Sequence, residues 1–458
     1  MPVTRSRSRV RPQQLAWGVL LLSFAVFCVL CIISAIGGYY FLYESTVPMQ
    51  SQLRVSRGTA VVSGADMIEQ AVRSGLDLFN RAMISTDPQS QATLSFFDQQ
   101  RDNALVAMLT MRSGSSFDMQ NVSRPRFDWS SKAYWINLTD VFGQFELFIP
   151  DDFEREIVVS LQTTHGVTVR LTAGGQYAIS SLAEQVSVSN YRGEALIVKP
   201  DRQQSRPVEL DQRVVYLVDG DQLTTSPTFV NLVGARSFSR ANVIGLNNEG
   251  TSLPDPLVWR CNSVENDAPR GSWGLVSEDG RPAVRFARGE GATSHAEASC
   301  SLSFGSQGID VSQYSYLSLR ATFKIGGHSL STCGTEGSEC PLMLRMFYYP
   351  VPDPFTPPGT GETLRSWFHG FFSTYQPERN FPLRCQDCIE QHEIVNAGTW
   401  YTYETGNLVT LLGSQRPREI SIIKFDASGH EYDVYISEIA LLADGATPAA
   451  TSDPQGSN

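Results

Sequence analysis

The sequence predicts an all-β protein carried on a single N-terminal membrane helix. One observation is an apolar run over residues 15–43 without Asp, Glu, Lys or Arg; it is longer than the roughly 20 residues that span a bilayer core. A second is that most of the remaining chain consists of short runs of alternating polar and apolar residues between Gly, Asn, Asp and Pro, which is typical of half-buried strands. A third is a composition rich in Val, Thr, Ser, Tyr and Phe, which favours strands over helices.

The apolar run has the flanks of a transmembrane helix. Trp17 lies at one end, and Tyr39 and Tyr43 lie at the other, where aromatic rings settle at membrane interfaces. Four arginines precede the run: Arg5, Arg7, Arg9 and Arg11. This asymmetry predicts a cytoplasmic tail at residues 1–14 and an extracytoplasmic location for everything after Glu44.

Two alternatives to a permanent anchor fit the run less well. A cleaved signal peptide has an apolar core of only about 7–15 residues, followed by a small-residue cleavage site. A lipoprotein signal needs small residues before its modified cysteine, whereas Cys28 and Cys31 follow bulky apolar residues. We therefore expect an uncleaved, single-pass anchor in the cell membrane.

The charge balance restricts the partners of the outer part. The chain has 47 acidic and 36 basic residues, for a net charge of −11, and four of the basic residues lie in the N-terminal tail. An outer part this acidic is a poor partner for nucleic acid or anionic lipid. Its length indicates two or three domains.

Six cysteines follow the membrane run, and all lie in the second half of the chain: Cys261, Cys300, Cys333, Cys340, Cys385 and Cys388. An even number in an oxidising compartment predicts three disulfides. Short loops favour Cys385–Cys388 and Cys333–Cys340, which leaves Cys261–Cys300, although six cysteines allow other pairings. The alternative is a zinc site made of the four cysteines between positions 333 and 388. No metal or other cofactor is expected if the disulfides form.

The first outer domain is expected at residues 54–220, after a polar stalk at residues 44–53. Its β-rich runs, separated by turn residues at regular intervals, predict a sandwich or barrel. Residues 65–84 instead have apolar side chains near helical spacing and predict the one helix of the outer part. These side chains are Ile68, Ala71, Val72, Leu76 and Phe79.

The order of motifs in residues 54–220 resembles the FecR-like domain. GTAVV is followed by MISTDPQSQATLSFFD, SLQTTHGVTVRLTAGGQYAI, EQVSVSNYRGEALIV and VELDQRVVYLVDG. The positions that match the family pattern are Gly58, Thr86, Ser90, Ala92, Leu94, Phe96, Asp98, Thr164, Gly166, Val186, Val188, Gly193 and Gln212. Asn80, Arg81 and Asp211 depart from it. Iron-uptake regulators of this family inhibit a sigma factor through a long cytoplasmic tail, and a tail of about 14 residues is too short for that role.

A second β-domain is expected at residues 257–444, after a linker at residues 221–256 rich in Gly, Pro and Asn. DVSQYSYLSLRA and GHEYDVYISEIALL look like the framing strands of galactose-binding-like jelly rolls, which include many carbohydrate-binding modules. This architectural resemblance implies a β-sandwich, and implies a glycan ligand only by analogy. Residues 445–458 are low in complexity and predict a disordered tail.

Aromatic side chains gather within a long insertion at residues 350–398: Trp367, Phe368, Phe371, Phe372 and Tyr375. They are the candidate ligand-binding residues, because aromatic surfaces stack against the apolar faces of sugar rings. A plug in the core is the favoured interpretation of the same residues, since large aromatic side chains are more often buried than displayed.

The sequence contains no recognisable catalytic motif. None of its six histidines lies in H-E-x-x-H, and no serine lies in G-x-S-x-G. The acidic residues 151–156 allow a glycosidase pair or a calcium site, but a solvated loop explains them more simply. We therefore expect a non-enzymatic binding or scaffold protein that recognises a glycan, a cell-wall component or an envelope protein. The alternatives are a glycan-acting enzyme of the envelope and a transmembrane signalling partner of the FecR type.

Overall fold

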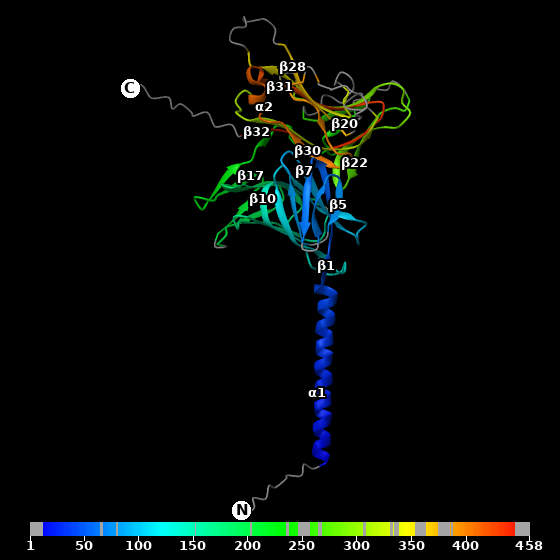
Figure 1. The fold of residues 1–458 in the computed structure, drawn as a ribbon, viewed down its shortest axis with the longest axis vertical. Coiled ribbons are helices and arrows are strands. Elements are labelled where there is room, and N and C mark those ends of the chain that lie inside the picture. Colours follow the sequence, from blue (N-terminus) through cyan, green and yellow to red (C-terminus); the bar gives the residue numbers. More distant parts are fainter. Residues whose placement is uncertain are drawn as a thin grey trace, which may run out of the picture.

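A long N-terminal helix carries two β-domains, which lie one beyond the other along its axis (Figure 1). The computed structural model describes residues 12–444 with internal gaps. The gaps are residues 65–66, 79–80, 152, 202–203, 235–237, 246–256, 264–267, 306–307, 330–332, 334–338, 353–362, 374–384 and 386–387. The expected tail at residues 445–458 and most of the expected cytoplasmic tail lie outside the described residues.

The helix α1, Pro12–Tyr39, continues into the π-helical turn η1, Tyr40–Glu44. Almost every described side chain of α1 is exposed, and the 29 residues from Ala16 to Glu44 are long and apolar enough to cross a membrane. A helix with apolar side chains on all sides cannot be covered by the rest of this chain, so it fits a membrane span or a signal sequence.

The first domain is a nearly closed β-barrel built from strands β1 to β18. Its strands are β1 Thr46–Pro48, β2 Gln50–Arg57, β3 Ala60–Gly64, β4 Met67–Val72, β5 Gly75–Leu78, β6 Ala82–Thr86, β7 Gln91–Asp98, β8 Ala104–Met111, β9 Ser116–Pro125, β10 Tyr134–Ile149, β11 Ile157–Thr163, β12 Thr168–Leu171, β13 Gly175–Ser181, β14 Gln185–Arg192, β15 Ala195–Val198, β16 Ser205–Val208, β17 Gln212–Leu217 and β18 Gln222–Pro227. The 16-residue strand β10 joins its two halves: the first part pairs with β9 and β11, and the second part pairs with β8 and β13. Alternate side chains of the strands fill one apolar core.

The predicted helix at residues 65–84 is wrong. The described part of this segment forms strands β4 and β5 and the start of β6. β4 pairs with β3, and β5 pairs with β2. Ile68, on the face expected to be buried, is 90% exposed. The backbone of this segment forms its hydrogen bonds with strands β2 and β3. This pairing outweighs the helical spacing of the apolar side chains, which Gly75 already interrupts.

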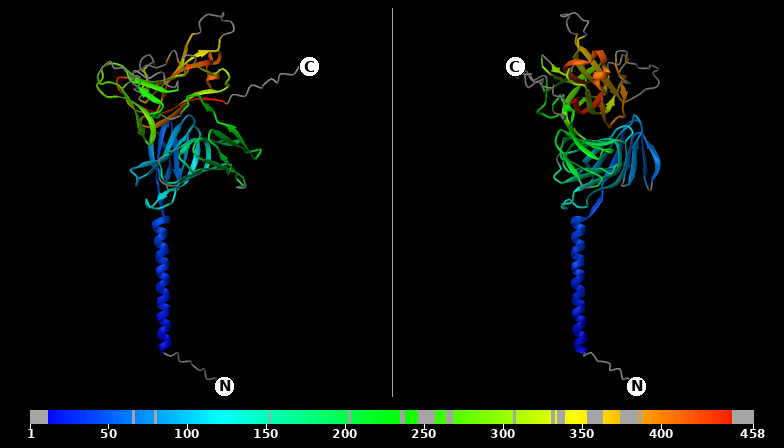
Figure 2. Two further views of the ribbon diagram at one scale, coloured as in Figure 1. Left: turned by 180° about the vertical axis from the view of Figure 1, so that it is seen from behind. Right: turned by 90° about the vertical axis from the view of Figure 1, so that its left-hand side faces the viewer.

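The second domain is a sandwich of two sheets (Figure 2). The domain-facing sheet has the order β22-β23-β32-β26-β30, with β19 beside β32, and the outer sheet has the order β20-β21-β24-β31-β27-β28-β29, with β25 beside β31. The elements are β19 Val230–Asn231, β20 Val243–Gly245, β21 Trp259–Ser263, β22 Ser272–Glu278, β23 Arg281–Arg288, β24 Ala296–Ser303, β25 Ile309–Asp310, β26 Leu317–His328, β27 Leu342–Pro350, β28 Arg365–Phe372, β29 Glu393–Ile394, β30 Trp400–Glu404, α2 Leu408–Leu411, η2 Gly413–Gln415, β31 Pro417–Gly429 and β32 Tyr432–Ala443.

The segment expected to be a linker, residues 221–256, contains regular structure. β18 extends the barrel by pairing with β17. β19 pairs with β32 of the domain-facing sheet, and β20 pairs with β21 of the outer sheet. Residues 246–256 lie outside the described part. The chain therefore passes from one domain to the other within a few residues after Pro227.

The domain-facing sheet packs directly on the barrel. Leu105 and Met108 from β8 share an apolar cluster with Ala283, Trp400 and Tyr435 from the sandwich. Because strand β26 is covered on both faces, its polar residues are as well buried as its apolar ones. The contact between the barrel and the domain-facing sheet provides the walls of the site described next.

Candidate ligand cleft between the domains

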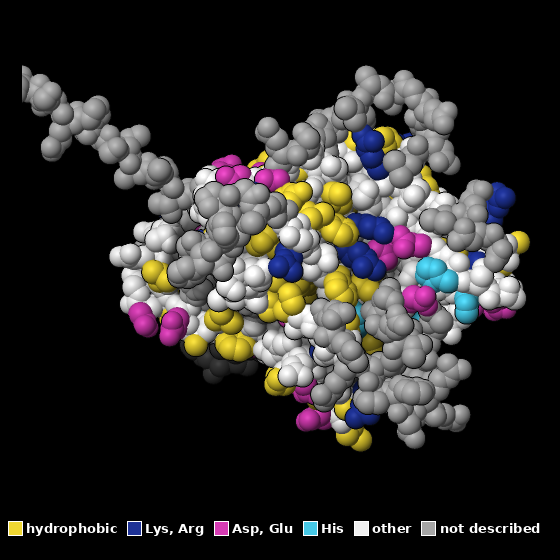
Figure 3. Space-filling view, turned by 90° about the horizontal axis from the view of Figure 1, so that it is seen from above, with side chains coloured by type: hydrophobic (Ala, Val, Ile, Leu, Met, Phe, Trp, Pro, Cys, Tyr) yellow, Lys and Arg dark blue, Asp and Glu magenta, His cyan; other side chains and the backbone are white. Residues whose placement is uncertain are grey.

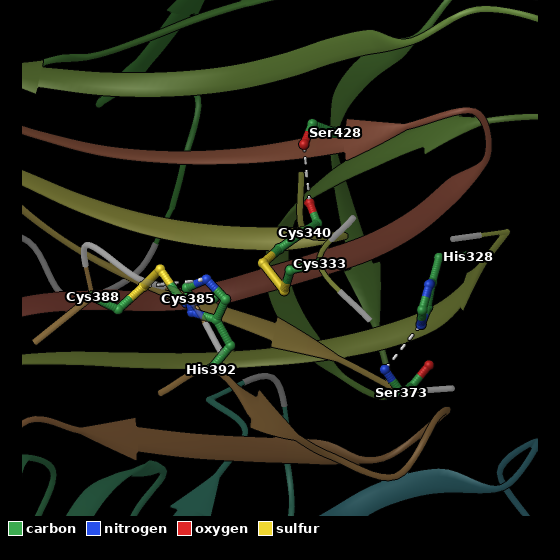
Figure 4. Close-up of a disulfide and its surroundings, with 9 residues drawn as sticks. His328, Cys333, Cys340, Ser373, Cys385, Cys388, His392 and Ser428 are labelled. Carbon is green, nitrogen blue, oxygen red and sulfur yellow. Dashed lines mark hydrogen bonds between the residues drawn. A yellow bond between two sulfur atoms is a disulfide. The ribbon is translucent and has the colours of Figure 1, made fainter. Parts of the chain in front are cut away.

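The three disulfides have the predicted pairings: Cys261–Cys300, Cys333–Cys340 and Cys385–Cys388. Cys261 lies directly opposite Cys300 on the neighbouring strands β21 and β24, inside the core of the sandwich. The other two lie together at the edge of the outer sheet (Figure 4).

The described aromatic residues of the insertion do not form an exposed platform. Trp367 and Phe371 are buried in the core of the sandwich, 1% and 0% exposed. Phe368 and Phe372 are partly buried against the apolar cluster around Cys333–Cys340, and Tyr375 lies outside the described residues. Trp367 to Phe372 belong to the regular strand β28, in which alternate residues point to opposite faces.

The outer face of the sandwich, seen from the end opposite helix α1, mixes apolar and charged side chains (Figure 3). Two pairs of opposite charges lie on strands of the outer sheet. Arg345 contacts Asp426 at 3.0 Å, and Lys424 contacts Glu297 at 2.5 Å. Paired charges within one face offer little to a charged ligand.

A hollow lies between the two domains. It consists of two neighbouring cavities of about 570 and 380 Å³, which are lined by residues of the barrel and of the domain-facing sheet. Both cavities are lined by Tyr191 and Phe229, so these two rings stand between them. Phe229 is supported by a stacked contact with Tyr316, with ring centroids 4.7 Å apart. We call this double cavity the cleft.

The barrel wall of the smaller cavity carries small hydroxyl side chains. Ser180 on β13 lies directly opposite Ser187 on β14, and Ser189 lies directly opposite Arg213 on β17. Their neighbours in the strands, such as Val188, point the other way into the barrel core. The alternation of these strands therefore produces a polar wall of hydroxyl groups beside one guanidinium group.

The wall of the larger cavity has longer polar side chains. Gln176, Arg192 and Asp211 come from the barrel, and Glu438 comes from β32 of the sandwich. The Gln176 amide donates to a carboxylate oxygen of Glu438 at 3.1 Å and so links the two domains within this cavity. The guanidinium group of Arg281 lies over the ring of Phe148, 4.6 Å from the ring centroid.

A buried ionic network joins the domains beside the cleft. Arg112 donates to Glu146 at 2.6 Å and to Glu404 at 2.9 Å. Arg320 donates to the other oxygen of Glu146 and lies 3.7 Å from Glu438. Each carboxylate thus has an arginine partner, and each of these arginines bridges carboxylates from both domains.

The protonation of Glu146 follows from this network. Burial by itself raises the pKa of a carboxyl group, but the nearby charges of Arg320 and Arg112 outweigh burial and lower the pKa of Glu146 to about 2. The same carboxylates raise the pKa of Arg320 against the opposing effect of burial. Glu146 and Arg320 are therefore both charged at neutral pH.

Sequence reasoning missed every residue of the cleft. Ser180, Tyr191 and Arg213 lie on strands with ordinary alternation, and nothing in their sequence separates them from other outward-facing residues. Arg320 carried a weak signal, because a charged residue in an otherwise apolar run such as LSLRATFKI requires a buried partner if both faces are covered.

Comparisons with known proteins find distant structural likenesses. No family model matches the chain, and no curated protein matches its sequence. A candidate anti-sigma factor from Parabacteroides distasonis is similar over 32% of this chain and 59% of its own length, with 12% identity and a TM-score of 0.22. The present chain thus spans less than two thirds of that protein.

Two carbohydrate-binding modules from Clostridium thermocellum are also similar. The family 11 module matches 45% of this chain and 94% of its own length, with 14% identity and a TM-score of 0.22. The family 30 module of a cellulosomal cellulase matches 38% of this chain and 83% of its own length, with 13% identity and a TM-score of 0.22. Scores this low assign no family, so the functional argument rests on the geometry of the cleft.

Proposed function

We propose that this protein is a membrane-anchored, non-enzymatic binding protein of the cell envelope, and that it binds a glycan chain in the cleft between its domains. The observation that carries the proposal is the pair of cavities on either side of Tyr191 and Phe229. Ligand sites occur preferentially at domain interfaces, in cavities of about 300–1,000 Å³.

The chemistry of the walls supports a ligand rich in hydroxyl groups. The apolar face of a sugar ring stacks on an aromatic ring, which Tyr191 and Phe229 supply. Sugar hydroxyls both donate and accept hydrogen bonds, and Ser180, Ser187 and Gln176 can do the same. Two cavities separated by aromatic rings allow successive units of one chain to occupy each side.

The ionisation of Glu146 supports binding over a role of this carboxyl group in hydrolysis. A glycosidase needs a carboxyl group that stays protonated near neutral pH to act as general acid. The pKa of Glu146 is instead lowered to about 2 by its arginine partners, which outweigh burial. Outside the cleft, Asp151 from the acidic loop is half exposed and contacts Arg192 at 2.7 Å, which supports a solvated loop there.

The location in the envelope is part of the proposal. The apolar helix and the three disulfides support an extracytoplasmic position for both domains. The arginines before the helix support a cytoplasmic N-terminus. Protease added to intact spheroplasts should remove the domains after Glu44 and spare the tail, and a mature chain that begins within or after the apolar run would contradict the anchor.

A glycan array with the full-length chain in detergent micelles tests the function, followed by affinity measurements for the best ligand. Tyr191→Ala and Phe229→Ala should each weaken binding by on the order of 1–3 kcal/mol, by analogy with ring stacking on bases. Trp129→Ala is the matched control, because Trp129 is 61% exposed on the barrel and lines neither cavity. An array without any bound glycan, or unchanged affinity in both cleft variants, would contradict the proposal.

A further inference from the structure

Two disulfides flank the imidazole ring of His392 (Figure 4). The Cys388 sulfur lies 3.6 Å from Nε2 of His392. The sulfur atoms of Cys333 and Cys340 also lie within 4.8 Å of each other and of a ring nitrogen of His392. Four sulfur atoms and the ring of His392 are thus gathered at the edge of the outer sheet, and none of these residues lines the cleft.

The hydrogen bonds of His392 determine where its proton lies. The backbone N–H of Gly370 donates to Nδ1 of His392, with 2.8 Å between the nitrogen atoms. A backbone amide can only donate, so Nδ1 is an acceptor and the neutral ring carries its proton on Nε2. The Nε2–H group therefore donates toward the sulfur of Cys388.

This proton position distinguishes thiol chemistry from metal binding. A histidine that ligates a metal uses a nitrogen free of its proton, and its other nitrogen usually donates to a neighbour. In His392 the nitrogen that faces the sulfur atom of Cys388, Nε2, keeps its proton, because Nδ1 accepts a hydrogen bond from Gly370. An N–H donor beside sulfur instead stabilises a thiolate.

The exposure of the sulfur pairs differs. Cys388 is partly exposed, whereas its partner Cys385 is 7% exposed. Cys261 and Cys300 are both 0% exposed in the core of the sandwich. An external thiol therefore reaches Cys388 before the other sulfur atoms of these two disulfides.

From these observations we propose that Cys385–Cys388 is an exchangeable disulfide, which reacts with an external dithiol first at Cys388 and releases a Cys388 thiolate held by His392. The partner is defined by its chemistry as a dithiol, either a small molecule or a protein. The proposal is independent of glycan binding in the cleft.

The exchange balances in two steps. A thiolate of the external dithiol attacks the Cys388 sulfur, the Cys385–Cys388 bond breaks, and its electron pair leaves on the sulfur of Cys385, which takes a proton from water. The second thiolate of the dithiol then attacks its own partner sulfur in the mixed disulfide and closes an external disulfide. Cys388 leaves as a thiolate beside the Nε2–H group of His392, and two electrons have passed from the dithiol to the protein.

A graded reduction of the wild-type chain tests the proposal without any variant. The full-length protein is equilibrated with increasing dithiothreitol, quenched in acid and alkylated, and each cysteine is quantified by peptide mass spectrometry. Cys385–Cys388 should open at dithiol concentrations that leave Cys261–Cys300 intact. Opening of both pairs together would overturn the proposal.

Two single-cysteine variants test which sulfur reacts first. Cys385→Ser leaves Cys388 as a thiol that should form a mixed disulfide rapidly with oxidised glutathione. Cys388→Ser leaves the buried Cys385, which should react slowly. Equal rates, or the reverse order, would contradict the assignment of Cys388.

The role of His392 as a positioning residue is tested by a pH profile. In the reduced chain, alkylation of Cys388 should start below the pH expected for an ordinary thiol with a pKa of about 8.5. His392→Phe removes the N–H donor and should shift the profile to higher pH, while His165→Phe in the barrel should not. A profile of Cys388 that is unchanged in His392→Phe would exclude the proposed role of His392.

Discussion

The side-chain amide of Gln91 pairs with the backbone of Thr402 in the way that a neighbouring strand would. Gln91 Nε2 donates to the Thr402 carbonyl oxygen at 3.0 Å, and the Thr402 N–H donates to Gln91 Oε1 at 2.8 Å. Gln91 belongs to β7 of the barrel and Thr402 to β30 of the sandwich, and both are buried. One side chain thus satisfies the backbone of the other domain at the edge of the domain-facing sheet.

Replacement of Gln91 should therefore loosen the contact between the domains. Gln91→Leu leaves the N–H and C=O groups of Thr402 buried without partners, which should lower the free energy of unfolding by about 1–3 kcal/mol. Denaturant unfolding of the full chain measures the loss. Gln99→Leu is the control, because Gln99 is exposed on the same domain and its side-chain amide donates to the side chain of Gln50 within the barrel. An equal loss in the control would contradict the interface role.

Glu146 should make the stability of the protein depend on pH in the acid range. Its pKa is about 2 in the folded chain, against burial and because of Arg320 and Arg112, and its ordinary value is 4.5. A carboxyl group whose pKa is lowered on folding stabilises the fold above its unfolded pKa, and this contribution is lost as the pH falls from about 4.5 to about 2. Unfolding measured across this range should show the loss in the wild-type chain.

Glu146→Gln separates this effect from general acid denaturation. The variant leaves the buried Arg320 with one carboxylate fewer, so it should be less stable at pH 7 by about 3–5 kcal/mol. The acid limb between pH 4.5 and 2 should also become flatter. An acid limb as steep as that of the wild type would show that other groups cause the pH dependence.

Trp367 should behave as a core residue and not as a ligand contact. Trp367→Ala should create a cavity and lower the free energy of unfolding by about 3–5 kcal/mol. Trp367→Phe should cost less, because it keeps much of the ring volume and removes an indole N–H that has no hydrogen-bond partner among the described residues. A Trp367 variant that loses glycan binding but keeps its melting temperature would contradict the core role and indicate that Trp367 contacts the ligand.

Gly370 should tolerate no side chain. A Cβ atom at this position would lie 2.0 Å from the Cys340 sulfur and 3.1 Å from Nδ1 of His392. Gly370→Ala should therefore displace Cys333–Cys340 and lower the melting temperature, with a cost of about 1–3 kcal/mol for overpacking. Gly327→Ala in β26 is the matched control, because its Cβ would meet no atom within 4 Å; similar melting temperatures for both variants would contradict the close packing.

Features that depend on neighbours in the sequence were predictable. The apolar helix, the all-β class and two of the three disulfide pairings follow from local patterns: an unbroken apolar run, alternation with period two, and cysteines close in the chain. The pairing Cys261–Cys300 followed by exclusion after the two short loops had been assigned. These patterns are read correctly because the forces behind them act over a few residues.

Features that depend on residues far apart in the sequence could not be predicted. Residues 65–84 have helical spacing, but β2 and β3 supply partners for their backbone, so they form strands. For Phe371 the sequence favoured burial over display on general grounds, and only the position of β28 in the outer sheet turns its ring into the core. Local apolar spacing cannot choose between such outcomes, because each choice depends on a surface that the folded chain supplies from elsewhere.

The cleft is the clearest example of a feature that depends on residues far apart in the sequence. The alternation in LSLRATFKI determined that Arg320, Thr322 and Lys324 share one face of a strand. Alternation alone would leave that face in water, and only the docking of the barrel against it buried Arg320 beside Glu146 and placed Tyr191 opposite the sandwich. The sequence by itself determined the elements and the faces of each element; the tertiary structure decided which faces meet, because burial and ion pairing between the domains depend on residues more than 100 positions apart.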